Sequence, residues 1–375
     1  MAVMAKRKRI YLDTAAGTPV DKRVMKAMLP YFSRDFGNPA SIHQEGLQAA
    51  KAVLEAKNSI AKQLGVHADE LIFTSGGTES NHLAFQLSAG GWALVSAIEH
   101  PSILLSAPNL IKAPVGESGV IDLEEFKKLL NPDIKLVSVM LVNNEIGTIQ
   151  PIREIAKIIR HYKKANQLTA NSYPYLHTDA CQATRFLDLF VPRLGVDLLT
   201  LNATKIYGPK GVGLLYVRRG IDLHRSGTEN VPGVVGLAKA LEITSAEREK
   251  ETKRLLILRA FFIAELKKIS GVIINGISQE QSPHIINATF PNILAEQMVI
   301  ELDARGIAVS TGSACIIANH DESYVIMALG RSKTEAQRSV RFSFSRDTTK
   351  ADLKQVIKTI NEMINKYARD IITKI

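Results

Sequence analysis

The chain contains little cysteine, little tryptophan and no apolar run of membrane length. Only two cysteines occur among its 375 residues, which excludes a disulfide framework and favours a reducing compartment. The longest apolar runs, such as residues 135–142, have the length of a strand, so we expect no membrane segment. The basic cluster at residues 6–9 is followed at once by a short apolar stretch and Asp13, without the apolar region of a secretory signal. We therefore expect a cytoplasmic protein.

The charge and histidine patterns give no sign of a nucleic-acid or metal site. The formal net charge is +10, and such a charge can attract nucleic acid or other acidic partners. The basic residues are dispersed, however, and no zinc-finger spacing or RNA-binding aromatic motif accompanies their short clusters. The nine histidines are scattered, without the paired spacing that binds metal. We favour a solvated basic surface over a nucleic-acid site, and we expect no bound metal and no direct nucleic-acid partner.

The first two thirds of the chain alternate strand-like and helix-like segments. This alternation is typical of a mostly parallel sheet covered by helices. A charged helical segment at residues 238–268 then leads to a region with an α+β pattern. The sequence has no internal repeat and no low-complexity tract. The expected strands lie at 70–74, 93–98, 135–142, 175–178, 197–201, 284–290 and 339–344, and the expected helices at 123–130, 152–164, 238–268, 295–305 and from 350.

Polar residues follow several of the expected strands, at the sheet edge where open α/β sheets bind their ligands. The strand at 70–74 leads into Ser75-Gly-Gly-Thr78 and the start of a helix. Backbone N–H groups, a capping hydroxyl and the helix dipole converge at such a point, where they can hold a phosphate. A capped helix without a ligand would show the same pattern, so this motif alone does not establish a site.

Two other strand ends carry Asp179 and Lys205. This pair suits pyridoxal phosphate (PLP), because a carboxylate can keep the pyridine nitrogen protonated while a lysine amine carries the aldehyde carbon. The protonated ring then acts as an electron sink. An Asp–Lys ion pair without a cofactor is the alternative. The run Gly208-Pro-Lys-Gly-Val-Gly213 lacks the spacing of a nucleotide-binding loop, and we interpret it as a turn.

These residues are part of a series of motifs that extends over nearly the whole chain. The motifs are Tyr11-Leu-Asp13, Phe36-Gly-Asn-Pro-Ala-Ser41, Phe73-Thr-Ser-Gly-Gly-Thr-Glu-Ser80, Glu99-His100, Val142-Asn-Asn-Glu-Ile-Gly147, His177-Thr-Asp-Ala-Cys-Gln182, Lys205-Ile-Tyr-Gly-Pro-Lys-Gly211, Leu215-Tyr-Val-Arg218, Arg225-Ser-Gly-Thr-Glu-Asn230, Ser310-Thr-Gly-Ser-Ala-Cys315 and Val340-Arg-Phe-Ser343. With them the chain resembles cysteine desulfurases of the NifS/IscS type, in the class V aminotransferase family. The motifs occur in the family's order, so chance agreement is negligible.

The resemblance implies a role for each matching residue. Lys205 would hold PLP as a Schiff base and move the proton of the substrate α-carbon. Cys315 would take sulfur from L-cysteine as a persulfide and release L-alanine, whereas Cys181 is expected to pack. The other implied contacts are to the pyridinium nitrogen (Asp179), to the ring's phenolic oxygen side (Gln182, Asn144), to the ring face with acid–base work (His100), to the phosphate (Gly77, Thr78, Asn202, Thr204, Thr228) and to the substrate (Arg341, Asn38).

The resemblance also implies the fold and the partners. PLP fold type I is an α/β fold, and we expect its large PLP-binding domain over residues 15–245, with a mostly parallel seven-stranded sheet between helices. Residues 1–14 and 246–375 would form a smaller α+β domain that carries the Cys315 loop. A homodimer is implied, in which Thr228 reaches the partner's cofactor phosphate. An acceptor protein would receive the sulfur for iron–sulfur clusters or tRNA thiolation.

Three segments depart from the family pattern. The family has Ser-x-His-Lys where this chain has Asn202-Ala-Thr-Lys205, although Asn and Thr can also donate hydrogen bonds. The segment 219–224 is shorter than its counterpart, and the residues after Cys315 are more apolar. The alternatives are therefore another PLP lyase or transaminase of this fold, or a weakly active homologue that acts as a binding protein. The intact lysine, aspartate and cysteine motifs favour the desulfurase.

Overall fold

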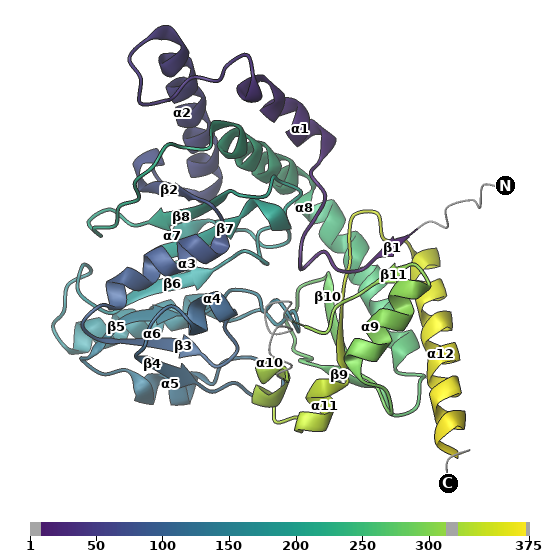
Figure 1. The fold of residues 1–375 in the computed structure, drawn as a ribbon. Coiled ribbons are helices and arrows are strands. Elements are labelled where there is room, and N and C mark those ends of the chain that lie inside the picture. The colour runs from purple at the N-terminus through teal and green to yellow at the C-terminus, as the bar shows by residue number, and fades with distance from the viewer. Residues whose placement is uncertain (1–8, 313–321, 373–375) are drawn as a thin grey trace.

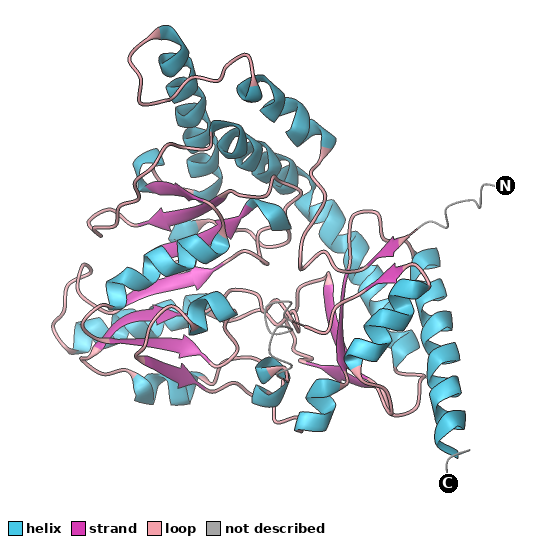
Figure 2. Cartoon of the chain, viewed as in Figure 1, coloured by secondary structure: helices cyan, strands magenta, loops and turns pink. Residues whose placement is uncertain are grey.

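The computed structural model describes residues 9–312 and 322–372. Figure 1 and Figure 2 show two separate groups of strands, each covered by its own helices. Residues 71–217 supply the larger group, and the smaller group combines the start of the described chain with its last third. The Cys315 loop, expected in the smaller group, lies outside the described residues.

The larger group is a seven-stranded sheet in the order β2-β8-β7-β6-β5-β3-β4. Strand β8 runs antiparallel to both of its neighbours, and the other strand pairs of this sheet are parallel, so the expected mostly parallel seven-stranded sheet is confirmed. Strands β6 and β8 are buried along their whole length, and the sequence of β8 is accordingly apolar throughout. The strands are β2 (Leu71–Thr74), β3 (Trp92–Ser96), β4 (Leu110–Ala113), β5 (Ile134–Ser138), β6 (Tyr175–Asp179), β7 (Leu198–Asn202) and β8 (Gly213–Val217).

Helices cover this sheet with apolar faces set by the 3.6-residue period. In α6 (Ile152–Ala165) the buried residues include Ile152, Ile155 and Ile159, which share one face, while the basic residues of the last turn complement the helix dipole. Helix α2 (Gln44–Leu64) ends at Gly65, whose φ of 70° suits glycine at this position. The other elements are α1 (Lys22–Met28), η1 (Leu29–Phe32), η2 (Ala68–Glu70), α3 (Gly77–Phe85), η3 (Gln86–Ser88), α4 (Pro101–Leu104), α5 (Leu123–Leu129), α7 (Val191–Leu194) and η4 (Ala203–Lys205).

The smaller group contains an antiparallel sheet in the order β12-β10-β9 and a two-stranded pair of β1 with β11. Its core packs the rings of Phe262, Phe290 and Phe342, all fully buried. The elements are β1 (Ile10–Tyr11), β9 (Ile273–Asn275), β10 (Ile285–Thr289), α9 (Ala295–Ala304), β11 (Ile307–Ala308), α10 (Tyr324–Ala328), α11 (Lys333–Gln337), β12 (Ser339–Ser343) and α12 (Lys350–Ile372).

One long helix, α8 (Val231–Leu266), connects the two groups (Figure 1). Its buried residues up to Ile243 belong to the core of the larger group, and those from Leu255 belong to the core of the smaller group. The proposed boundary at residues 245 and 246 falls between them. Ile10 and Leu12 lie in the smaller core as well, which supports assigning residues 9–14, the described part of the expected segment 1–14, to that domain. The division into two domains stays a prediction with this support.

Several elements differ from the sequence expectation. Helix α8 begins at Val231 rather than residue 238, because Asn230 caps it by accepting from the Gly233 N–H at 3.0 Å. The elements β4, β8 and α2 are not among those expected. The β8 sequence is a short, continuous apolar run, which alternation cannot assign to a strand. No helix within residues 9–312 or 322–372 is long and apolar enough to cross a membrane.

Candidate active site

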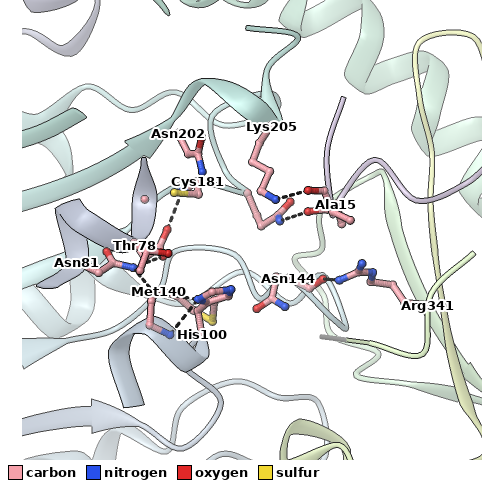
Figure 3. A pocket seen from close by; sticks show the side chains of 15 residues that line it. Ala15, Thr78, Asn81, His100, Met140, Asn144, Cys181, Asn202, Lys205 and Arg341 are labelled. Atoms are coloured by element: carbon pink, nitrogen blue, oxygen red, sulfur yellow. Dashed lines mark hydrogen bonds between the residues drawn. The ribbon is translucent and has the colours of Figure 1, made fainter. Parts of the chain in front are cut away.

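A pocket of about 250 Å³ lies at the carboxyl ends of the central strands (Figure 3). Asp179 ends β6 and Asn202 ends β7, while Arg341 reaches the pocket from β12 of the smaller group. The pocket thus draws on both groups of strands. Its lining residues are Ala15, Ala16, Gly77, Thr78, Asn81, His100, Ser102, Met140, Asn144, Asp179, Cys181, Gln182, Asn202, Lys205 and Arg341.

Lys205 follows β7 in a single turn of 3₁₀ helix and projects into the pocket. Its Nζ donates to the Ala16 carbonyl at 2.7 Å. Burial lowers the pKa of this amine, and the nearby Arg341 lowers it further. The lowered pKa increases the share of neutral amine, which is the form that attacks a carbonyl carbon. Lys205 is therefore suited to carry a covalently bound aldehyde.

Asp179 is 7% exposed and has both carboxylate oxygens occupied by neutral donors. One oxygen accepts from the Asn81 side-chain amide and the other from the Cys181 N–H, each at 2.9 Å. These donors hold the carboxylate in one orientation. A fixed, buried carboxylate that lines the same pocket as a lysine matches the pair expected for a protonated pyridine ring.

His100 caps the short helix α4, and that cap determines its tautomer. Its Nδ1 accepts from the Ser102 N–H at 3.1 Å, so Nδ1 carries no proton and the neutral ring holds its proton on Nε2. Burial lowers the pKa of the imidazole, which favours the neutral form. The Ser102 hydroxyl accepts from Asn81 at 2.9 Å, and Asn81 also donates to Asp179. Asn81 therefore connects the histidine and the aspartate through one hydrogen-bond chain.

The start of α3 forms a cradle with the space that a phosphate needs. Gly76 has a φ of 158°, and a Cβ on Gly77 would lie 2.9 Å from Cys181 Sγ, so a side chain there would collide. Asn202 Oδ1 accepts from both the N–H and the hydroxyl of Thr204, at 3.0 and 2.8 Å. This orientation turns the Asn202 Nδ2 donor toward the cradle, 3.5 Å from a Gly77 Cβ position. The helix N-terminus adds partial positive charge.

Arg341 and Asn144 lie on the other side of the pocket (Figure 3). The guanidinium donates to the Asn144 carbonyl at 2.9 Å and pairs with Asp13 at 2.8 Å. Asn144 Oδ1 is buried and has no hydrogen-bond partner among the described residues. A buried polar atom without a partner in a pocket indicates a position for a ligand atom. Gln182 Nε2 donates to the Ala15 carbonyl at 2.9 Å, which brings the N-terminal segment to the pocket.

Nine of the expected site residues line this pocket, and three other described ones do not. Thr204 acts only through Asn202. Asn38 is exposed, and its side chain accepts from the Ala40 N–H at 3.0 Å within its own loop. Thr228 is exposed as well, in a loop whose Arg225 pairs with Glu79 of α3 at 2.7 Å. Cys315 lies outside the described residues. Within one chain, therefore, neither Asn38 nor Thr228 reaches the pocket.

Cys181 lies at the pocket wall and not only in the packing that the sequence predicts. Its thiol is buried, and burial together with Asp179 raises its pKa well above the ordinary value. A neutral thiol is a poor nucleophile, so Cys181 shapes the cradle without being suited to attack.

Asn81 and Ser102 are polar pocket residues that sequence reasoning missed, and Ala15, Ala16 and Met140 complete the lining that it did not predict. Asn81 and Ser102 lie on helices that follow recognised motifs, one turn beyond Gly77 and two residues beyond His100. Helical spacing from those motifs was the available signal. Among residues 9–312 and 322–372, no group of three His, Cys, Asp or Glu side chains is placed to hold a metal.

The pocket fits PLP on its own features. It combines a lysine with a lowered amine pKa, a fixed carboxylate, a glycine cradle at a helix N-terminus and an unpartnered amide oxygen. The first three are the groups that the aldehyde, the pyridine nitrogen and the phosphate require, and the amide oxygen can accept from a hydroxyl on the ring.

Comparisons with known proteins agree with this site. Residues 10–224 and 222–356 match the aminotransferase class-V family. Cysteine desulfurase IscS of Dictyoglomus turgidum is 41% identical, with 96% of this chain and 95% of the relative covered. The solved structure of a NifS-like protein has a TM-score of 0.86 at 32% identity, covering 96% of this chain and all of its own. The structure of SspA in complex with cysteine has a TM-score of 0.75 at 30% identity, with 90% of this chain and 99% of the SspA chain covered.

The structural likeness confirms PLP fold type I, and the relatives give no support to a transaminase or a binding protein. The chain belongs to the aminotransferase class-V family and, within it, to the PLP-dependent cysteine desulfurases.

Proposed function

We propose that the pocket holds PLP through Lys205 and converts L-cysteine to L-alanine, with the sulfur passing to Cys315. One observation carries the proposal: Lys205 and Asp179 line a single pocket, with the glycine cradle at its wall. Bound PLP supplies an electron sink for the substrate's α-carbon. Gly77, Thr78 and Asn202 would hold the phosphate, and Asp179 the pyridine nitrogen.

The remaining pocket residues would position the substrate and move protons. Arg341 is shaped to bind a carboxylate with two parallel hydrogen bonds. Its Nη2 is paired with Asp13, so the substrate carboxylate would share or replace that partner. The neutral Lys205 amine can accept the α-proton, and the Nε2–H of His100 can donate to a leaving group. Asn144 and Gln182 would contact the ring's oxygen side.

Cys315 is proposed as the nucleophile. Its thiolate would attack the substrate sulfur, the carbon–sulfur bond would break, and a persulfide would remain on the enzyme. The described chain leads toward this position from beside the substrate site, because Ser310 and Arg341 exchange backbone hydrogen bonds at 3.2 and 2.7 Å. Cys315 is the fifth residue after Ser310, a span of at most about 18 Å. Because the backbone of Ser310 is bonded to that of Arg341, the thiolate of Cys315 lies within chain reach of the Arg341 end of the pocket.

The finer assignments extend this proposal. We propose a cytoplasmic homodimer in which the loop around Thr228 and the loop around Asn38 face the partner. Their exposure in the single chain and the link from Arg225 to the first turn of α3 support it. An iron–sulfur scaffold or a tRNA thiolation enzyme would take the sulfur, as the IscS name of the relatives suggests.

The test is to add L-cysteine to purified holoenzyme and measure alanine, sulfide and the mass of the protein. We expect equal alanine and transferable sulfur, and a mass gain of one sulfur atom that maps to Cys315. Lys205→Ala should abolish alanine formation, and Cys315→Ser should abolish the mass gain. Cys181→Ser is the matched control and should keep the persulfide. Alanine formation at the wild-type rate in Cys315→Ser would overturn the assigned nucleophile.

A further inference from the structure

A second cavity, of about 240 Å³, lies where α8 passes between the two cores, and the proposed reaction does not use it. We call it the basic cavity. Five of its lining side chains are cationic and two are carboxylates. Its lining residues are Arg185, Tyr207, Thr244, Glu247, Arg248, Lys250, Glu251, Arg254 and Arg346.

The acidic groups around the basic cavity already have close partners. Glu251 is held by two hydrogen bonds from Arg254, both at 2.9 Å. Glu247 pairs at 2.8 Å with Arg23, which comes from α1. Arg346 pairs with Asp21. These carboxylates therefore leave little negative charge for the other cations of the cavity.

Arg185 and Arg248 have no carboxylate at hydrogen-bond distance among the described residues. The Arg185 side chain is only 5% exposed, and the nearest carboxylate is that of Glu251 at 4.0 Å. Its Nη atoms donate only to neutral oxygens, at 3.2–3.5 Å. Arg248 has a buried Nε without a hydrogen-bond partner among the described residues, and its closest carboxylate is Asp188 at 3.9 Å. Buried charges are normally paired and hydrogen-bonded.

Aromatic rings hold the Arg185 guanidinium in place. It lies 4.6 Å from the ring centre of Phe186 and 4.9 Å from that of Tyr207. Stacking on these rings leaves its donors in a fixed plane. A guanidinium with a fixed orientation and weak neutral partners is prepared for an oxygen-rich anion, since the planar fork matches two oxygens at once.

We propose that the basic cavity binds a small tetrahedral oxyanion of the phosphate or sulfate type, with Arg185 and Arg248 as its main ligands. Lys250 adds an exposed ammonium at the same cavity. Cations that approach from several elements suit an ion with several equivalent oxygens. The volume of about 240 Å³ leaves ample room for an ion of this size.

The bound anion would join the two cores and the catalytic segment. Arg185 and Tyr207 belong to the large-sheet side, and Tyr207 follows Lys205 by two residues. Arg346 follows β12, the strand that carries Arg341. Arg254 also binds the Ser345 carbonyl at 2.9 Å, which ties α8 to the smaller group. An anion that neutralises these cations stabilises the contact between the two cores, by ordinary linkage of binding and folding.

The test uses holoenzyme with excess PLP, so that the cofactor's own phosphate cradle stays filled. Inorganic phosphate or sulfate is titrated while the melting temperature and the heat of binding are followed, with sodium chloride at matched ionic strength as reference. We expect saturable stabilisation by both oxyanions beyond that of chloride. Arg248→Gln should weaken the apparent affinity about tenfold or more, because hydrogen bonds to charged groups are among the strongest.

Variants separate a specific site from general screening of the basic protein. Arg185→Gln should also weaken binding. Arg248 is the safer variant, since its side chain is 20% exposed and less needed for folding. Arg219→Gln is the matched control, because Arg219 is exposed and pairs with Asp69 elsewhere. Stabilisation that equals that of chloride, or that falls equally in Arg219→Gln and Arg248→Gln, would overturn the proposal.

Discussion

Glu145 offers the sharpest test of the electrostatics near the active site. Its carboxyl is fully buried, and one oxygen accepts from the Ser323 hydroxyl at 2.6 Å. The other oxygen has no hydrogen-bond partner in the described chain, and a Cβ on Gly312 would lie 2.8 Å from the carboxyl carbon. Burial raises the pKa of Glu145 to about 7, although Ser323 and Arg341 act to lower it. We therefore expect this group to be neutral in weakly acidic solution.

The perturbation is Glu145→Gln, which keeps the shape and removes the ionisation. A pKa raised from 4.5 to about 7 on folding means that the folded protein binds this proton more tightly. The stabilisation is complete below the unfolded pKa and is lost as the pH rises through the folded pKa. Between about pH 5.5 and about pH 8.5, this single group lowers the free energy of unfolding by about 2 kcal/mol. Glutamine does not ionise, so the free energy of unfolding of the Glu145→Gln variant does not show this decrease with pH.

The assay is urea unfolding of both proteins, as holoenzymes, across this pH range. All other titrating groups are shared, so the difference between the two unfolding free energies isolates Glu145. We expect the variant to gain about 2 kcal/mol relative to the natural chain as the pH rises. Glu322→Gln is the control, because that carboxylate pairs with Lys333 at 2.8 Å and its pKa is lowered. A pH-independent difference for Glu145→Gln would refute the reasoning.

Two further predictions concern the pocket. Gly77→Ala would bring a Cβ within 2.9 Å of Cys181 Sγ and should weaken PLP binding about tenfold in a titration of the apoenzyme, whereas unchanged affinity would argue against the phosphate cradle. Asp13→Asn removes the anionic partner of Arg341, whose side chain is 3% exposed, and should cost about 3 kcal/mol in urea unfolding. Asp303→Asn, at an exposed ion pair with Arg9, should change stability little, and an equal loss in both would contradict this prediction.

Much of the fold follows from local patterns in the sequence. Strands β5, β6 and β7 and helices α5 and α6 lie close to their expected positions, because a repeated apolar spacing reports which side of a segment is buried. Once the strands are placed, their carboxyl ends indicate where a ligand binds, because open α/β sheets bind ligands at that edge. Lys205, Asp179 and Gly77, which the sequence places at or just after strand ends, line one pocket in the structure.

The rest of the site depends on which distant segments pack together. The pairing of Arg341 with Asp13 joins residues separated by 328 positions, and no periodicity records it. Thr204 showed its role only through the orientation of Asn202, and Asn38 proved to lie away from the pocket.

The active-site pocket and the basic cavity show most clearly what the sequence determines and what the tertiary structure determines. The sequence by itself indicated the chemistry of the pocket, because a lysine and an aspartate at neighbouring strand ends occur together with the motif series that resembles the cysteine desulfurases. Only the tertiary structure decided where charge is left uncompensated. Arg185 and Arg248 are distant in sequence, and the folded chain brings both to the basic cavity. Burial then turns dispersed surface charge into a binding site, since solvent no longer screens it.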